Sequence, residues 1–127
     1  MKPTVLNITD LAHAQTELTK IGVHPTGTQI MALKAIHRNV KFQAVDPKTA
    51  NIIKQEMLSR GGDVALAGTV GKFEETKTDI IIMGNLAQYI RLIKKLKFQT
   101  YPDCQQIAVN LQELLFKNYD IEAAPVW

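Results

Sequence analysis

The chain has 127 residues, of which 46% are hydrophobic and 21% charged, with a formal net charge of +3. This length suffices for one domain with its own hydrophobic core, and the composition excludes an intrinsically disordered chain. A single cysteine, Cys104, excludes an internal disulfide and favours a reducing, cytosolic setting.

The first elements are a short strand and a helix. Residues 4–8 are prone to β structure and predict a strand. Thr9 and Asp10 are candidate N-caps for a helix over residues 10–21, and Gly22 follows where a C-terminal glycine belongs. Its apolar stripe comprises Leu11, Ala14, Leu18 and Ile21.

Residues 29–45 carry a mixed signal after a predicted turn over residues 23–27. The apolar stretch over residues 30–35 is compatible with either a helix or a buried strand. Residues 40–45 alternate in polarity, as a half-exposed strand does. We interpret the region as two strands separated by a break near residues 37–39.

The middle of the chain begins with a helix over residues 46–60, since Asp46 is a natural N-cap and Pro47 fits the first helical position. Gly61 and Gly62 end this helix, and a strand is predicted over residues 63–67. A loop over residues 68–77 precedes four large apolar residues, 80–83. Such a run predicts a central strand buried on both faces.

Two helices complete the pattern. The helix over residues 86–97 has its apolar stripe at Leu86, Ile90, Ile93 and Leu96 or Lys97. Pro102 and Asp103 open the last helix, whose wide apolar face comprises Cys104, Ile107, Ala108, Leu111, Leu114 and Leu115. The tail over residues 119–127 has no periodicity.

These elements predict an α+β (or α/β) fold, with the order β-α-β-β-α-β-β-α-α and about four helices packed on a small sheet. We expect residues 1–118 to form one compact layered domain and residues 119–127 to form a C-terminal tail. Residues 1–7 lack the apolar core of a signal peptide, and no apolar run approaches the length of a membrane span. A cytoplasmic protein without membrane contact is therefore expected.

The reactive side chains do not form a catalytic or metal-binding pattern, so we predict no catalytic residue, metal or cofactor. Cys104 lies on an apolar helical stripe, where a thiol is inert. His13, His24 and His37 lack the spacing of metal ligands. Asp79 at a strand start has the place of a turn or cap residue. A small enzyme using His37 or Asp79 is the least favoured hypothesis.

Two glycine pairs resemble phosphate-binding loops only in part. Residues 68–71 spell the G-x-x-G sequence of nucleic-acid-binding KH loops, but a predicted strand precedes them and Glu74 and Glu75 follow closely. Gly61 and Gly62 end a helix, whereas a phosphate cradle begins one. A hairpin with glycines at positive φ explains residues 68–71 better.

Basic residues gather in two stretches that contain no acid, one between Glu17 and Asp46 and one between Asp79 and Asp103. Such stretches are more often solvated faces of ordinary elements. As a functional alternative they predict a surface for a small anion or nucleic acid. Its candidate residues are Lys34, His37, Arg38, Lys41, Arg91, Lys94 and Lys95.

Several segments resemble one family. They are the residues 21–25, 30–35, 50–65, 78–84 with Gln88, and 95–99. Together they resemble the N-terminal extension domain of a bacterial dihydropteroate synthase of the clostridial and thermophile type. Leu33 and His24 depart from that pattern, which has proline and an acid there.

The resemblance implies an accessory domain linked to folate biosynthesis. In such synthases a downstream barrel of about 250 residues performs the chemistry, so no catalytic residue is carried over to this chain. The implied partners are a synthase barrel or a second copy of the chain, and the implied action is protein–protein contact.

Overall fold

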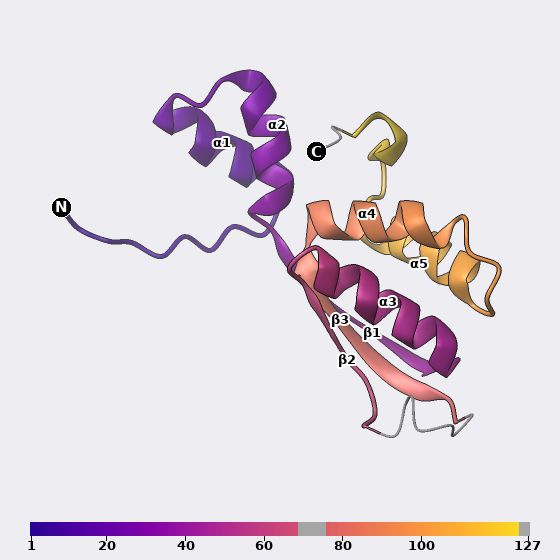
Figure 1. The fold of residues 1–127 in the computed structure, drawn as a ribbon. Coiled ribbons are helices and arrows are strands. Elements are labelled where there is room, and N and C mark those ends of the chain that lie inside the picture. The colour runs from indigo at the N-terminus through magenta and orange to yellow at the C-terminus, as the bar shows by residue number, and fades with distance from the viewer. Residues whose placement is uncertain (69–75, 125–127) are drawn as a thin grey trace.

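The computed structural model describes residues 1–68 and 76–124. A three-stranded antiparallel sheet has the order β1-β3-β2, with β1 at His37–Val45, β2 at Asp63–Ala65 and β3 at Thr78–Asn85. The helices α3 (Pro47–Ser59), α4 (Leu86–Leu96) and α5 (Cys104–Leu115) pack as a layer on one face of this sheet (Figure 1). The α+β prediction is confirmed.

The N-terminal part differs from its prediction. Residues 4–8 form no strand, and residues 30–35 belong to a helix, α2 at Pro25–Lys34, instead of a strand. His24 caps this helix through Nδ1, which accepts from the Thr26 N–H at 3.3 Å, and Pro25 occupies its first turn. A capping side chain followed by proline can therefore start a helix, even where the apolar run that comes next is also compatible with a strand.

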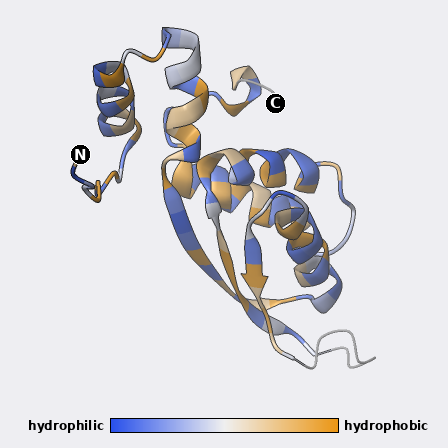
Figure 2. Cartoon of the chain, turned by 60° about the vertical axis from the view of Figure 1, so that its left-hand side comes forward, coloured by the Kyte–Doolittle hydropathy of each residue, from blue (hydrophilic) through white to orange (hydrophobic). Residues whose placement is uncertain are grey.

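A helical arm, α1 and α2, projects from the rest of the molecule (Figure 1). The helix α1, Leu11–Ile21, agrees with its prediction: Asp10 caps it, and Gly22 ends it at a φ of 94°. Figure 2 shows polar and apolar residues interleaved along α1. Only part of the predicted stripe is buried, since Ala14 is fully buried but Ile21 is 80% exposed.

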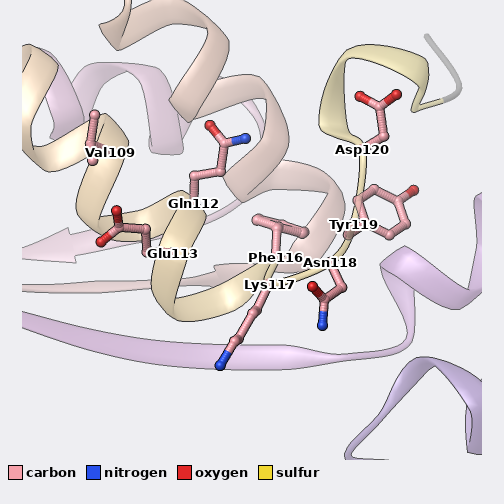
Figure 3. Close-up of a pocket in the computed structure, with 8 residues that line it drawn as sticks. All are labelled: Val109, Gln112, Glu113, Phe116, Lys117, Asn118, Tyr119 and Asp120. Carbon is pink, nitrogen blue, oxygen red and sulfur yellow. The ribbon is translucent and has the colours of Figure 1, made fainter.

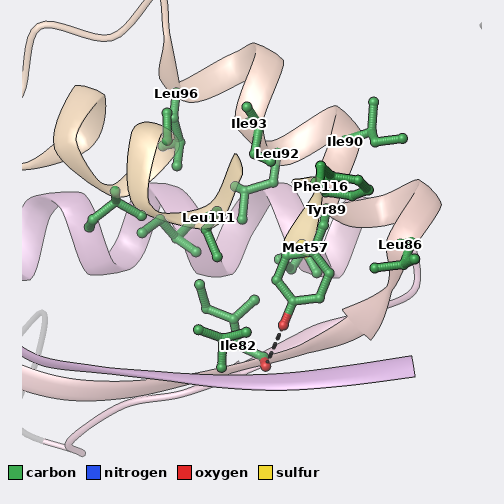
Figure 4. Close-up of a cluster of buried hydrophobic side chains, with 14 of the residues drawn as sticks. Met57, Ile82, Leu86, Tyr89, Ile90, Leu92, Ile93, Leu96, Leu111 and Phe116 are labelled. Carbon is green, nitrogen blue, oxygen red and sulfur yellow. Dashed lines mark hydrogen bonds between the residues drawn. The ribbon is translucent and has the colours of Figure 1, made fainter. Parts of the chain in front are cut away.

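The body, residues 36–116, contains the main core. In Figure 4 the side chain of Tyr89 points from α4 toward the sheet, and its hydroxyl bonds to the carbonyl of Ile82 at 2.8 Å. The same hydroxyl lies 2.9 Å from the carbonyl of Arg38, so one side chain ties α4 to both β1 and β3. Burial raises the pKa of Tyr89. The predicted α4 stripe is confirmed, with Leu86, Ile90, Ile93 and Leu96 all buried.

The strand β3 is central, as predicted, but it is not buried on both faces. Ile80 and Ile82 are buried beneath the helices, whereas Ile81 is 39% exposed on the opposite face. An antiparallel sheet commonly leaves one face to water, and no described element covers this one. The prediction from residues 80–83 that both faces of this strand are buried is therefore wrong.

A bulge ends the regular pairing of β1. The register shifts between Phe42 and Val45, and Ala44 has a φ of 54°. The Asp79 carboxylate accepts from the Ala44 N–H at 3.0 Å, which satisfies a backbone donor at the irregular position. Asp79 thus has a structural contact at the bulge of β1, and not at the turn or helix cap that its sequence position predicts.

The buried face of the last helix, α5, is shorter than the apolar face that the sequence predicts. Cys104, Ile107, Ala108 and Leu111 are buried, but Leu114 is 66% exposed. After α5 a short 3₁₀ helix, η1 at Ile121–Ala123, follows, and Ile121 is fully buried in the core.

Candidate cationic site at the ends of three helices

A polar depression lies where α2 and α3 end and α4 begins. It has a volume of about 440 Å³ and is lined by Lys34, Ser59, Arg60, Asn85, Ala87, Gln88 and Arg91. Three of these side chains are cationic, and they come from three different helical segments. None of the seven is a carboxylate. The lining of the depression is therefore cationic, with Arg60 paired to Glu56 Oε1 at 3.4 Å.

The first turn of α4 is held by a reciprocal cap. The Gln88 N–H donates to Asn85 Oδ1 at 2.9 Å, and the Asn85 N–H donates to Gln88 Oε1 at 2.7 Å. This is a capping box, in which two backbone donors that the helix leaves without partners are satisfied by side chains. Asn85 and Gln88 therefore have fixed positions at the floor of the depression.

Gln88 also ties α4 to the end of α3. Its Nε2 donates to the carbonyl of Arg60 at 2.7 Å. A Cβ at Gly84 would lie 2.5 Å from Met57 Cε, and one at Gly62 would lie 2.7 Å from the carbonyl oxygen of Met83. These two glycines permit the close approach of α3, β3 and α4 that brings Arg60 beside Arg91.

A second depression adjoins the first and shares Lys34, Asn85 and Gln88 with it. It adds His37, whose Nε2 lies 2.9 Å from Asn39 Oδ1, and it includes the carboxylate of Asp63. The hydrogen bond from the Val64 N–H has the largest effect in lowering the pKa of Asp63 below its usual value. Lys54 Nζ, 3.3 Å from Asp63 Oδ1, lowers it further. The second depression therefore has a carboxylate in its lining, whereas the seven residues that line the first include none.

Three of the seven predicted anion-binding residues line these two depressions: Lys34 lines both, Arg91 the first and His37 the second. Arg38 donates instead to the carbonyls of Thr9 and His37. Lys41 lies on the open face of the sheet, across from Ile81.

Lys94 and Lys95 lie in the last turn of α4, where cations interact favourably with the helix dipole. Sequence reasoning missed Arg60, because its only signal was a position beside the glycines that end α3.

Cys104 is fully buried, as its place on the apolar stripe predicts. Burial raises the pKa of its thiol, and Asp103 and Asp46 add to this effect, while a contact with Thr49 Oγ1 at 3.7 Å opposes it. The thiol is therefore protonated and shielded at neutral pH.

The remaining histidine also has a local role. His13 lies on the exposed side of α1, as predicted, with Nε2 3.7 Å from Glu17 Oε1. Across residues 1–68 and 76–124, no three His, Cys, Asp or Glu side chains gather as metal ligands. No helix in those ranges is long and apolar enough to cross a membrane.

A larger depression of about 850 Å³ lies at the C-terminal end of α5. It is lined by three residues of α5, Val109, Gln112 and Glu113, and by residues 116–120, which follow the helix (Figure 3). Its charges alternate in sign, with Lys117 between Glu113 and Asp120, and Asp120 already accepts from the N–H of Glu122 at 3.0 Å. This depression has less charge selectivity than the cationic one.

Two predictions fall partly outside the described residues. The hairpin over residues 68–71, with Glu74 and Glu75 after it, lies there except for Gly68. The last three residues of the tail, 125–127, also lie there.

Comparison with known proteins gives two relatives. A probable bifunctional folylpolyglutamate synthase/dihydropteroate synthase of Halobacterium salinarum is 32% identical over 119 residues, which is 94% of this chain. A protein of the same description from Haloferax volcanii is 33% identical over 93 residues, or 73% of the chain. No family model matches the chain, and no solved structure matches it.

The chain spans only 14% and 10% of the length of these relatives. The similarity therefore supports a relation to folate-synthesis enzymes at the level of a small part of those proteins. It agrees with the folate connection that the sequence resemblance implied.

Proposed function

We propose that the chain is a non-catalytic accessory domain linked to folate biosynthesis, similar to the N-terminal extension of dihydropteroate synthases, and that it acts through protein–protein contact. One observation carries the proposal: 94% of the chain aligns with 14% of a much longer protein named as a folate-synthesis enzyme. A segment of that kind has the size of a domain.

The positions of the reactive side chains support a non-catalytic role. The thiol of Cys104 is buried, the carboxylate of Asp79 accepts from the β1 bulge, and His24 caps α2. Each is thus occupied by a structural contact. The proposal places the chain in the cytosol, where a single reduced thiol is stable.

The turn between α4 and α5 supports contact with a protein. Phe98 is 86% exposed and Tyr101 is 47% exposed, and both lie in this turn. Exposed aromatic side chains are frequent anchors at protein interfaces. Lys94 and Lys95 precede the turn, so the partner surface that fits it is an apolar pocket with an acidic rim.

Size-exclusion chromatography with light scattering tests the proposal. The chain is mixed with the dihydropteroate synthase of the same organism, and the chain alone is run to detect a second copy. We expect co-elution with the synthase or a dimer mass, at about tens of micromolar. Two independent peaks together with a monomer mass would refute contact with either partner.

A matched pair of variants locates the contact. Phe98→Ser removes the exposed aromatic ring and should weaken association by about tenfold or more. Val5→Ser is the control, because Val5 is 87% exposed in the N-terminal segment, far from the turn in the chain. An equal effect of the two substitutions would exclude the α4–α5 turn as the contact surface.

A further inference from the structure

We propose that two copies of the chain exchange their N-terminal segments, so that residues 4–7 of each copy pair with the outer edge of β1 in the other. This contact is separate from the one proposed at the turn between α4 and α5. Each can fail without the other, because the N-terminal segment and β1 share no residue with that turn.

The outer edge of β1 is open in the part of the chain that the structure describes. The Ile36 carbonyl accepts from the Leu86 N–H at 3.0 Å, and β1 continues in the same register along β3. Even-numbered residues of β1 therefore direct their backbone groups to β3, and the odd-numbered Asn39 and Lys41 direct theirs outward. Among the described residues, none hydrogen-bonds to the backbone of Asn39 or Lys41 at that edge.

The opposite edge of the sheet, at β2, is closed by side chains. By the same alternation the backbone groups of Val64 point outward. Its N–H donates to Asp63 Oδ1 at 2.7 Å, and its carbonyl accepts from Lys54 Nζ at 2.9 Å. Since β2 also has only three residues, an added strand finds open backbone groups at β1 and not at β2.

Residues 1–7 form an extended segment whose backbone groups are also without partners. All seven residues are exposed, with Val5 at 87% and Leu6 at 52%, and no hydrogen bond joins them to the other described residues. Residues 4–7 are uncharged and prone to β structure. The sequence therefore predicts a strand that one chain alone does not form, and its lack of charge suits an edge that carries Arg38 and Lys41.

The base of the segment favours a second copy as its partner. Ile8 is partly buried against the core, and Arg38 of β1 donates to the Thr9 carbonyl. From this fixed point the segment runs away from its own sheet (Figure 1). Seven extended residues span about 25 Å, which is enough to reach a neighbouring molecule. Because both copies carry the same segment and the same edge, the exchange is reciprocal and closes at two chains.

Antiparallel pairing, the mode of the existing sheet, sets the faces of the added strand. Its odd-numbered residues must pair with the odd-numbered residues of β1, with two hydrogen bonds for each pair. The resulting pairs join Asn7 to Asn39 and Val5 to Lys41 of the second copy. Leu6 then lies on the face of the sheet that the helices cover, and Val5 lies on the open face.

The length of the segment matches the regular part of β1. In this register Pro3 falls opposite Gln43 of the second copy, and proline has no N–H to donate. The register of β1 itself shifts between Phe42 and Val45. The added strand and the strand that receives it therefore end at the same place.

Light scattering over a concentration series, combined with hydrogen exchange of the Asn39 and Lys41 amides, tests the proposal. We expect the mass to rise toward that of a dimer between about 20 µM and about 1 mM, with slower exchange of both amides. A monomer mass throughout, with both amides unprotected, would overturn the proposal. Slow exchange of both amides in a chain that stays monomeric would also overturn it, because the segment would then pair with its own β1.

A matched pair of substitutions at residue 7 tests the backbone pairing. Asn7→Pro removes the N–H that donates to the Asn39 carbonyl and should weaken dimerisation by about tenfold, since a reciprocal exchange contains this bond twice. Asn7→Thr keeps the N–H and should leave dimerisation unchanged. Residue 7 is exposed, so neither substitution disturbs the core. Equal dimerisation of the wild type and Asn7→Pro would exclude the segment as the contact.

Removal of residues 1–7 separates this contact from the one at the α4–α5 turn. The truncated chain should remain monomeric and still bind the synthase, whereas Phe98→Ser should weaken synthase binding and still dimerise. Val5→Ser should affect neither, because its side chain lies on the open face of the added strand. A truncated chain that dimerises as the wild type does would refute the segment exchange.

Discussion

The helical arm and the body differ in how far their helices bury apolar side chains. In the body, α3, α4 and α5 bury apolar stripes against a sheet, and residues such as Ile53, Met57 and Tyr89 are fully buried. In the arm, α1 packs on α2 and α2 packs on α4. The arm has only one layer, so Ile21 stays exposed although it continues the α1 stripe.

The difference shows that periodicity predicts which face of a helix turns inward, but burial requires a second layer. Most helical stability in proteins comes from packing of the apolar face. We therefore expect equal substitutions to have unequal effects in the two regions, and each prediction below compares one pair of sites.

The largest contrast concerns isoleucine. Ile53→Ala removes a fully buried side chain from α3 and should lower the free energy of unfolding by about 2–5 kcal/mol. Ile21→Ala at an exposed end of α1 should change it by less than about 0.5 kcal/mol. Urea denaturation measures both. Equal losses would contradict the exposed position of Ile21.

Glycine substitution gives the second contrast. A Cβ at Gly62 meets the fixed carbonyl oxygen of Met83 at 2.7 Å, so Gly62→Ala should cost about 1–3 kcal/mol. In the arm, a Cβ at Gly27 meets only Val23 Cγ1, at 3.1 Å, and alanine favours the helix. Gly27→Ala should therefore cost less. Thermal melts that rank the two variants in the opposite order would contradict this reasoning.

Helix capping gives a smaller contrast. Asn85→Ala breaks the capping box of α4 and should cost about 1 kcal/mol of global stability. Asp10→Ala removes the cap of α1, where Asp10 Oδ1 accepts from the His13 N–H at 2.7 Å. Its effect should be confined to faster hydrogen exchange in α1, because local opening needs little unpacking there. Slower hydrogen exchange of the backbone amides in α1 than of those in α4 would contradict this expectation.

The smallest effect is a pH dependence from Cys104. Burial raises the pKa of its thiol, so the folded state keeps a proton that the unfolded state loses. Stability from this group is fully present below the unfolded pKa of about 8.5 and falls as pH rises above it. Cys104→Ala should make the free energy of unfolding less dependent on pH in that range. An unchanged slope would show that the thiol does not contribute.

Local signals in the sequence predicted the body well. Asp46 with Pro47, and the apolar stripe that begins at Leu86, identify the starts of α3 and α4, because caps and periodicity depend on neighbouring residues. The strand order and the open sheet face depend on contacts distant in sequence. For that reason the run over residues 80–83 indicated a central strand but not the exposure of Ile81.

The cationic site was predictable only in part for the same reason. Lys34 and Arg91 stand in the two acid-free stretches, so a charge pattern finds them. Arg60 joins them only through the approach of α3 to α4, which depends on Gly62 and Gly84. Arg38, whose neighbourhood in the sequence is equally basic, is directed to the carbonyl of Thr9.

The most direct test of the accessory role is an anisotropy titration of the chain, labelled at its exposed N-terminus, with the dihydropteroate synthase of the same organism. The account predicts a saturable rise that Phe98→Ser weakens about tenfold and Val5→Ser leaves unchanged. A flat titration up to about 100 µM synthase, with the labelled chain monomeric and folded, would contradict it.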